Sequence, residues 1–235
     1  MTAKPPLLVV LVITVLAGAL VFGPPVTASS GYDISISGSV DVPDRSVSFD
    51  GNSFTISRVK AIDPGESFTA SLDVPSEDTE YSVQLRDLDK NTYDAAFLNG
   101  DESVTFDAGE LGLGPGAYFV AIRNDTFRDV FPVIVEGYDV RVNDIPESAG
   151  EGSTINVSAT VTENADSGQS LSGVDVVIAS GATSKIVQIS GSDGDVSGAV
   201  SLEEVSPGTY SVYVAARGDE EIGGEKVPIG LSSPY

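Results

Sequence analysis

Acidic and amide side chains form the one group in this sequence whose spacing matches a known ligand pattern. Asp87, Asp89 and Asn91 stand at alternate positions, as do the first three ligands of an EF-hand calcium loop. The match then fails, because Thr92 stands where that loop needs glycine and Leu98 stands where it needs a bidentate glutamate. The segment therefore fits a hairpin turn between two strands better than a calcium loop.

A second acidic turn surrounds Gly194, a residue that can adopt the unusual backbone angles of a tight turn. Neither segment supplies a complete set of ligands, so we predict no metal site and no cofactor. The weak calcium candidates are Asp87, Asp89, Asn91, Asp193 and Asp195.

The residue types on which most enzymes depend are missing from the chain. It contains no histidine and no cysteine, which excludes Ser-His-Asp triads, histidine–metal sites and thiol nucleophiles. Paired carboxylates could still hydrolyse glycosides, but among 35 acidic residues such pairs arise by chance. No phosphate-binding glycine loop precedes a helix. We therefore predict that the chain is not an enzyme and has no catalytic or cofactor-binding residues.

Two N-glycosylation sequons are present, Asn124-Asp125-Thr126 and Asn156-Val157-Ser158. The first is expected in an accessible turn between two strands, and the second on the outward side of a strand. Asn124 and Asn156 are therefore candidate glycan acceptors in a host that exports the protein.

The N-terminal segment has the features of a secretory signal peptide. Lys4 precedes an apolar run over 7–22, Gly23-Pro24-Pro25 then breaks any helix, and small residues lead to a predicted cleavage between Ala28 and Ser29. There is no twin arginine, so we expect the general secretory route and an extracellular or cell-surface location. The alternative is an uncleaved anchor, although the run is short against the roughly 20 residues that a bilayer needs. Membrane contact is expected only through this segment.

The charge balance is strongly acidic. Lys and Arg total 12 against 35 Asp and Glu, a formal net charge of −23 at pH 7. Such a surface repels itself in dilute buffer, whereas molar salt shortens the Debye length to about 3 Å and screens the repulsion. The acids are interleaved with apolar residues, which favours a folded protein of a halophile over a disordered tail. An ordinary acidic secreted protein is the alternative. With no basic patch, nucleic acid is not an expected partner.

A weak internal repeat indicates two domains, 31–136 and 137–235. Three landmarks recur in the same order: a Gly-Tyr-Asp strand start, a short segment beginning with glycine, and a Pro-Gly-x-Tyr turn. The matched segments are 31–36 with 137–142, 65–68 with 152–155, and 115–120 with 207–212. The boundary at Glu136–Gly137 has almost no linker, which predicts a stiff, end-to-end pair of domains.

The Pro-Gly-x-Tyr elements place Tyr118 and Tyr210 at the start of a late strand. This position resembles the tyrosine corner of immunoglobulin-like folds, in which the hydroxyl bonds back to the preceding loop. We therefore interpret both residues as structural anchors.

Alternating apolar residues and frequent turns predict an all-β protein of two tandem immunoglobulin-like β-sandwiches after the signal peptide. Val157 and Ala159, for example, are expected to face the core, with Asn156 and Ser158 facing outward. The predicted strands of the first domain are 32–40, 53–60, 67–74, 80–87, 93–98, 103–107, 117–123 and 128–135. Those of the second are 138–144, 153–162, 173–180, 184–190, 196–202, 208–216 and 225–231.

Three segments of the first domain carry a family resemblance. Tyr-Ser-Val-Gln-Leu-Arg-Asp at 81–87, Glu-Ser-Val-Thr-Phe-Asp at 102–107 and Gly-Ala-Tyr-Phe-Val at 116–120 resemble the immunoglobulin-like modules of haloarchaeal cell-surface, S-layer-type glycoproteins. The resemblance covers about residues 50–125 and implies a surface glycoprotein. The chain lacks the threonine-rich stalk and C-terminal anchor of the large surface-layer proteins.

The leading functional hypothesis is an exported, non-catalytic structural or adhesion-type protein of a halophile. Its partners would be other cell-envelope proteins or surface glycans. The alternative is a secreted accessory protein that binds a polysaccharide or a metal ion. Phe119 and Tyr213 face away from the predicted cores and distinguish the two hypotheses: exposed on one flat sheet they would favour ligand binding, and covered they would favour the structural role.

Overall fold

The computed structural model describes residues 31–49, 51–164, 167–180, 183–189, 191, 193–222 and 225–235. The predicted signal peptide, residues 1–28, and its cleavage site at Ala28–Ser29 lie outside these residues. Among the residues described, no helix is long and apolar enough to cross a membrane.

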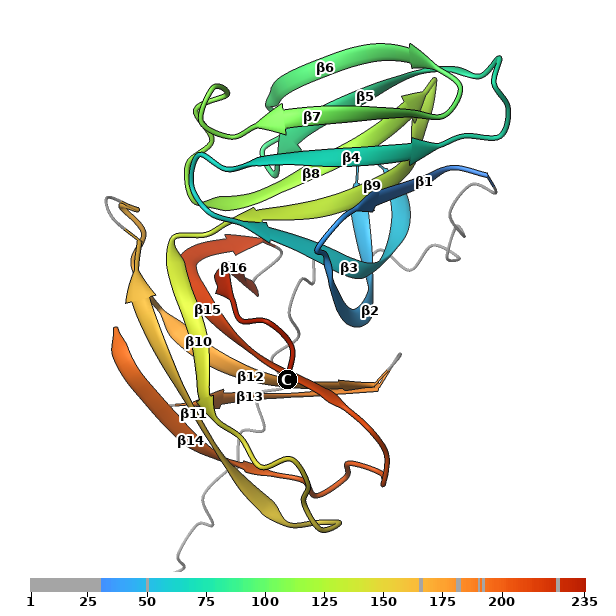
Figure 1. Ribbon diagram of the computed structural model, residues 1–235. Helices are drawn as coiled ribbons and strands as arrows, with labels where there is room; N and C mark the ends of the chain where they lie inside the picture. The colour runs from blue at the N-terminus through green and yellow to red at the C-terminus, as the bar shows by residue number, and fades with distance from the viewer. Residues whose placement is uncertain are drawn as a thin grey trace, which may run out of the picture.

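The described chain is built of β-strands, as predicted (Figure 1). The strands of the first half are β1 (Asp33–Ile36), β2 (Val40–Phe49), β3 (Asn52–Ile62), β4 (Ser67–Asp73), β5 (Glu80–Asp87), β6 (Thr92–Asn99), β7 (Glu102–Asp107), β8 (Gly116–Asn124) and β9 (Thr126–Val135). Those of the second half are β10 (Tyr138–Asp144), β11 (Thr154–Glu163), β12 (Gly173–Ser180), β13 (Thr183–Ile189), β14 (Gly194–Ser201), β15 (Ser211–Ile222) and β16 (Glu225–Leu231).

Both halves follow one strand order, that of an immunoglobulin-like sandwich. In the first half, β1-β4-β7 faces β2-β3-β9-β8-β5-β6, and in the second, β10-β11-β14 faces β13-β12-β15-β16. Apart from β2 and β3, each strand of the first half therefore has a counterpart in the second. Each pair of sheets encloses its own hydrophobic core. The repeat in the sequence thus corresponds to a repeat in topology.

Alternation of apolar and polar side chains along the chain explains why these segments form sheets. In β11, residues at alternate positions from Ile155 to Val161 are buried, while Thr154 and Asn156 are exposed. Since successive side chains on a strand point to opposite faces, this pattern buries one face only. The predicted orientation of this strand is confirmed.

The first half contains a hairpin that the sequence did not predict. The strand predicted over 32–40 ends at Ile36, the chain turns at 37–38, and β2 then begins at Val40. Pro43 and Asp44 suggest a turn rather than a strand. In the structure, a bulge in the β2–β3 ladder between Asp41 and Arg45 accommodates these residues.

The β2–β3 hairpin covers the outer face of the neighbouring strands. Phe49 packs its ring 5.3 Å from that of Phe119 on β8 and 4.9 Å from that of Phe127 on β9. Phe119 is consequently only 4% exposed. The far end of β3 then runs parallel to β9, pairing Lys60 with Val133. The first half therefore has an extra layer at this face.

Candidate functional site

The calcium candidates near Asp87 are engaged in a turn. Both Asp87 carboxylate oxygens accept hydrogen bonds from Asn91, Oδ1 from the backbone N–H at 2.8 Å and Oδ2 from the side-chain amide at 2.7 Å. The Tyr93 hydroxyl donates a third, at 3.3 Å. These hydrogen bonds outweigh partial burial and hold the pKa of Asp87 below its usual value.

The second pair of calcium candidates lies apart on β14 and the turn before it. Asp193 Oδ1 accepts the Glu163 N–H at 3.3 Å, and Asp195 Oδ1 accepts the Thr160 hydroxyl at 2.9 Å. Among the described residues, no three acidic side chains approach closely enough to hold a metal ion.

The two sequons differ in accessibility. Asn156 is exposed on β11. Asn124 is half-buried, and its side-chain amide donates to the Tyr32 hydroxyl at 3.3 Å and to the Glu80 carbonyl at 3.0 Å. A glycan on Asn124 would replace one hydrogen of this donating amide. Use of either site stays a prediction.

Tyr118 and Tyr210 make equivalent hydrogen bonds. The Tyr118 hydroxyl donates to the Gly114 carbonyl at 2.8 Å, and the Tyr210 hydroxyl donates to the Ser206 carbonyl at 2.7 Å. In each case the acceptor lies four residues earlier in the chain, which is the backward bond that defines a tyrosine corner.

We predict that Tyr118→Phe lowers the free energy of unfolding by about 1 kcal/mol, the usual net value of one hydrogen bond. Tyr210→Phe should cost less, because that hydroxyl lies in an exposed bond that water can replace. Urea denaturation of both variants measures the difference. Equal midpoints for Tyr118→Phe and the parent protein would contradict the anchoring role.

The junction at Glu136–Gly137 is hydrogen-bonded within each half, and the Glu136 side chain also bonds across it. The Glu136 N–H donates to the Ile62 carbonyl at 2.8 Å, and the Gly137 N–H donates to the Ile229 carbonyl at 2.7 Å. The Glu136 side chain accepts the Leu231 N–H at 2.7 Å. Burial raises the pKa of Glu136 to about 7, against the lowering effect of that hydrogen bond. The junction therefore contacts β3 on one side and β16 on the other.

A second contact joins the halves along a sheet face rather than end to end. The hairpin residue Val42 packs against a buried group on the outer face of the β12–β15 pair, which includes Val177 and Tyr213. Arg45 of the same hairpin donates to the Ser184 hydroxyl at 3.1 Å. Tyr213 is only 4% exposed, and burial raises its pKa. The end-to-end arrangement expected from the sequence is therefore wrong.

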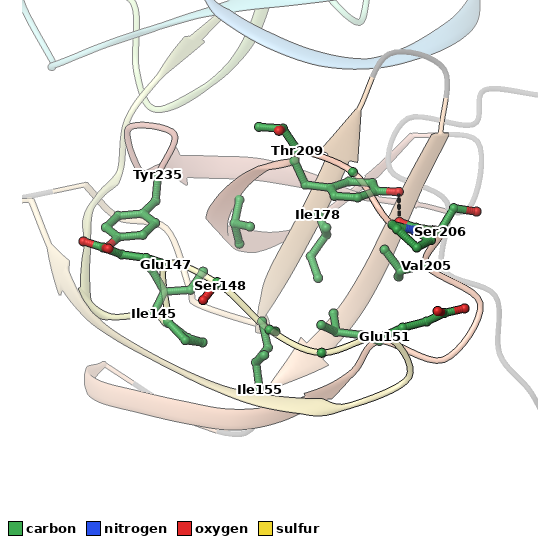
Figure 2. A pocket seen from close by; sticks show the side chains of 18 residues that line it. Ile145, Glu147, Ser148, Glu151, Ile155, Ile178, Val205, Ser206, Thr209 and Tyr235 are labelled. Atoms are coloured by element: carbon green, nitrogen blue, oxygen red, sulfur yellow. Dashed lines mark hydrogen bonds between the residues drawn. The ribbon is translucent and has the colours of Figure 1, made fainter.

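A hollow opens at one end of the second sandwich, between the segments 145–151 and 202–210 (Figure 2). Its volume is about 590 Å³, within the range of small-molecule pockets. Its walls combine aliphatic residues from both sheets with polar, proline and tyrosine residues, while Glu147 and Glu151 lie exposed at its rim. The main aliphatic wall residues are Ile145, Ile155, Ile178, Leu202, Val205 and Val212.

The two sandwiches differ at one equivalent position near this end. Leu113 lies five residues before Tyr118, as Val205 lies five residues before Tyr210. Leu113 is buried in the core of the first half, where its N–H donates to the Ala108 carbonyl at 2.9 Å. Val205 is smaller and only half-buried. This position therefore carries a larger and more buried side chain in the first sandwich than in the second.

This hollow was missed in the sequence, although comparing Leu113 with Val205 across the repeat could have indicated it. It contains Ser148, Ser206 and Thr209 but neither histidine nor cysteine, because the chain has none. It can hold an apolar group beside carboxylates, and its lining offers no nucleophile–base pair of the Ser-His or Cys-His kind.

No protein-family model matches the chain, and no curated protein matches it. Several solved structures show distant similarity. The BSP domain of a biofilm-associated protein is 13% identical with a TM-score of 0.25, over 82% of this chain and 28% of that one. The chain thus spans under a third of that protein's length. The human OSCAR ligand-binding domain is 11% identical with a TM-score of 0.27, over 74% of this chain and 92% of that one. The FN1–FN3 domains of chicken CNTN1 are 14% identical with a TM-score of 0.23, over 75% of this chain and 60% of that one.

Proposed function

We propose that this chain is an exported, non-catalytic structural or adhesion-type protein that presents two rigidly linked immunoglobulin-like domains at the surface of a halophile. The coverage of Phe119 and Tyr213 carries the proposal. Both aromatic side chains face away from the cores and are buried, Phe119 by the β2–β3 hairpin and Tyr213 in the contact between the halves. They stiffen the molecule, and neither of them forms an exposed aromatic platform for a sugar.

The contact between the halves favours one fixed orientation. Its residues are largely apolar and leave a cavity of only about 60 Å³. An apolar void of that size stays dry, so separating the halves would expose apolar surface to water. A rigid pair holds its exposed loops at a constant distance, as a structural or adhesive role requires.

We predict that Val42→Asp loosens this arrangement, because it places a carboxylate against Tyr213 and Val177. Small-angle X-ray scattering should then show a larger radius of gyration and a broader distance distribution. Thr55→Asp is the matched control, since Thr55 is exposed on the same hairpin. Unchanged scattering for Val42→Asp would contradict a rigid contact.

Location tests the surface role directly. A C-terminally tagged full chain, produced in its own host, should be labelled by antibody on intact cells or recovered from the medium. Labelling that appears only after lysis would overturn the proposal. Mass spectrometry of the same material determines whether the signal is cleaved after Ala28, and whether Asn124 or Asn156 carries a glycan.

The proposal that the host is a halophile rests on the net charge of −23. Screening of this charge should make the melting temperature, followed by circular dichroism, rise from low to molar salt. A melting temperature that does not change with salt would favour an ordinary acidic secreted protein.

Ligand binding is a second candidate function, favoured by the hollow near Val205. Aliphatic walls with Glu147 and Glu151 at the rim suit an apolar compound with a cationic end better than a polysaccharide. Alkylamines of increasing length should raise the melting temperature of the parent protein. Val205→Leu, which copies the first domain, should reduce that rise, and no rise with any amine would exclude this function.

A further inference from the structure

Two tyrosine side chains line the hollow at the end of the second sandwich, together with its aliphatic residues. Tyr210 packs, half-buried, against the core of this half, and its hydroxyl is held by the bond to the Ser206 carbonyl. Tyr235 is 55% exposed. One ring is therefore fixed within the wall, and the other lies at the edge of the hollow.

The main chain holds Tyr235 in this place. Its N–H donates to the Val212 carbonyl at 2.8 Å, and its carbonyl accepts the Val212 N–H at 3.1 Å. Val212 belongs to β15 and itself lines the hollow. In Figure 2, Tyr235 lies on the same side of the hollow as Glu147, and Glu151 lies on the other side. The Tyr235 ring is thus positioned by backbone bonds that a side-chain substitution leaves in place.

The charge around the hollow is acidic. The two segments between which it opens, 145–151 and 202–210, contain four glutamates and no lysine or arginine. The glutamates, all exposed, are Glu147, Glu151, Glu203 and Glu204. Lys185 donates to the Glu203 carbonyl at 2.7 Å, but it does not line the hollow. The opening therefore attracts a cation and repels an anion.

We propose that the hollow binds a quaternary ammonium group that carries an alkyl chain, and that Tyr210 and Tyr235 select this head group. The proposal rests on the ligand-binding candidate described above and adds the chemistry of the ligand's charged end. Tyrosine rings attract cations, and quaternary ammonium ligands are the group that proteins recognise in this way. A quaternary ammonium has no N–H group, whereas a primary ammonium has three donors that aliphatic walls cannot satisfy.

Isothermal titration calorimetry of the full chain, at pH 7 and one fixed salt concentration, tests the choice of head group. Hexyltrimethylammonium and hexylamine have the same alkyl chain and the same charge at this pH, and hexanol has no charge. We expect the dissociation constant of hexyltrimethylammonium to be about threefold or more below that of hexylamine. Hexanol should bind more weakly than either cation.

Tyr235→Leu tests the role of the ring, because leucine keeps an apolar side chain at the edge of the hollow. This variant should lose most of the preference for hexyltrimethylammonium and bind hexylamine about as well as the parent protein does. Tyr93→Leu is the matched control, since it removes a 38% exposed ring from the first half and should leave both dissociation constants unchanged.

The outcomes separate this proposal from the candidate on which it rests. Equal affinities for the two cations, or a preference that Tyr235→Leu leaves unchanged, would overturn selection by the tyrosines while amine binding stands. Failure of all three compounds to bind would exclude the ligand-binding candidate and this proposal with it.

Discussion

Asp175→Asn should lower the free energy of unfolding by about 3 to 5 kcal/mol, the largest single-residue loss that we expect in this protein. Asp175 and Arg217 form an ion pair with side chains only 1% and 5% exposed. Burial raises the pKa of Asp175, and the adjacent guanidinium offsets only part of that rise. Removing the carboxylate would leave Arg217 charged and buried, with its Nη1 bonded to the Lys226 carbonyl at 3.2 Å.

An exposed pair provides the matched control for this variant. Arg141 and Asp139 lie 2.8 Å apart, but their side chains are 77% and 42% exposed. Asp139→Asn should therefore change stability by less than about 1 kcal/mol. Denaturant unfolding of both variants measures the contrast. If Asp175→Asn cost no more than Asp139→Asn, the pair would not be desolvated as the structure describes.

A double replacement separates the cost of the orphaned charge from the value of the pair. Asp175→Val together with Arg217→Met removes both charges and keeps apolar volume at the site. We expect this protein to recover most of the stability that Asp175→Asn loses, because well-packed apolar residues often replace a buried pair without penalty. A double variant as unstable as Asp175→Asn would contradict this explanation.

Local patterns in the sequence were sufficient to predict most of the strands. Regular alternation marks β11, and the Pro-Gly-x-Tyr turns lead to β8 and β15 in equivalent places. These signals are short-range, so they require no knowledge of what covers each sheet. The end of β15 was less predictable: the strand extends to Ile222, six residues beyond its predicted end at 216.

Coverage of the outer faces could not be predicted in the same way. Asp175 alternates with Val174 and Val176, so its position indicates only that it faces away from the core. Whether that face meets solvent depends on how the two halves contact each other. That contact depends in turn on the β2–β3 hairpin, which was missed because Pro43 interrupts its first strand. Tyr213 is covered in this contact and therefore went unpredicted, and the alternation around Asp175 gave no sign that its ion pair with Arg217 is buried.

Glu136→Gln should stabilise the protein at pH 8 by about 2 to 3 kcal/mol and leave it nearly unchanged at pH 5. The folded-state pKa of Glu136 is about 7, above its ordinary value of 4.5, because the carboxyl is buried. Between these two values the folded protein holds a proton that the unfolded chain releases. Stability from this group is therefore present at low pH and is lost as the pH rises through about 7.

The charges that surround Glu136 act in the same direction. Asp63, Glu66 and Asp139 all raise its pKa, whereas the hydrogen bond from the Leu231 N–H lowers it. Glutamine keeps the oxygen that accepts this N–H bond but has no charge to bury. The variant should thus retain the junction while losing the pH dependence that Glu136 contributes.

Melting temperatures measured from pH 5 to pH 8 would test this, with Glu80→Gln as a control at an exposed site. Asp129, whose pKa burial raises from 3.8 to about 6, also loses its contribution to stability as the pH rises between these two values, equally in both proteins. The informative quantity is therefore the difference between the Glu136→Gln and parent curves, which should widen between about pH 4.5 and pH 7 and level off above pH 7. Parallel curves would mean that Glu136 is solvated and that the two halves are not held together through its side chain. A widening difference would show that folding at the junction opposes ionisation of Glu136.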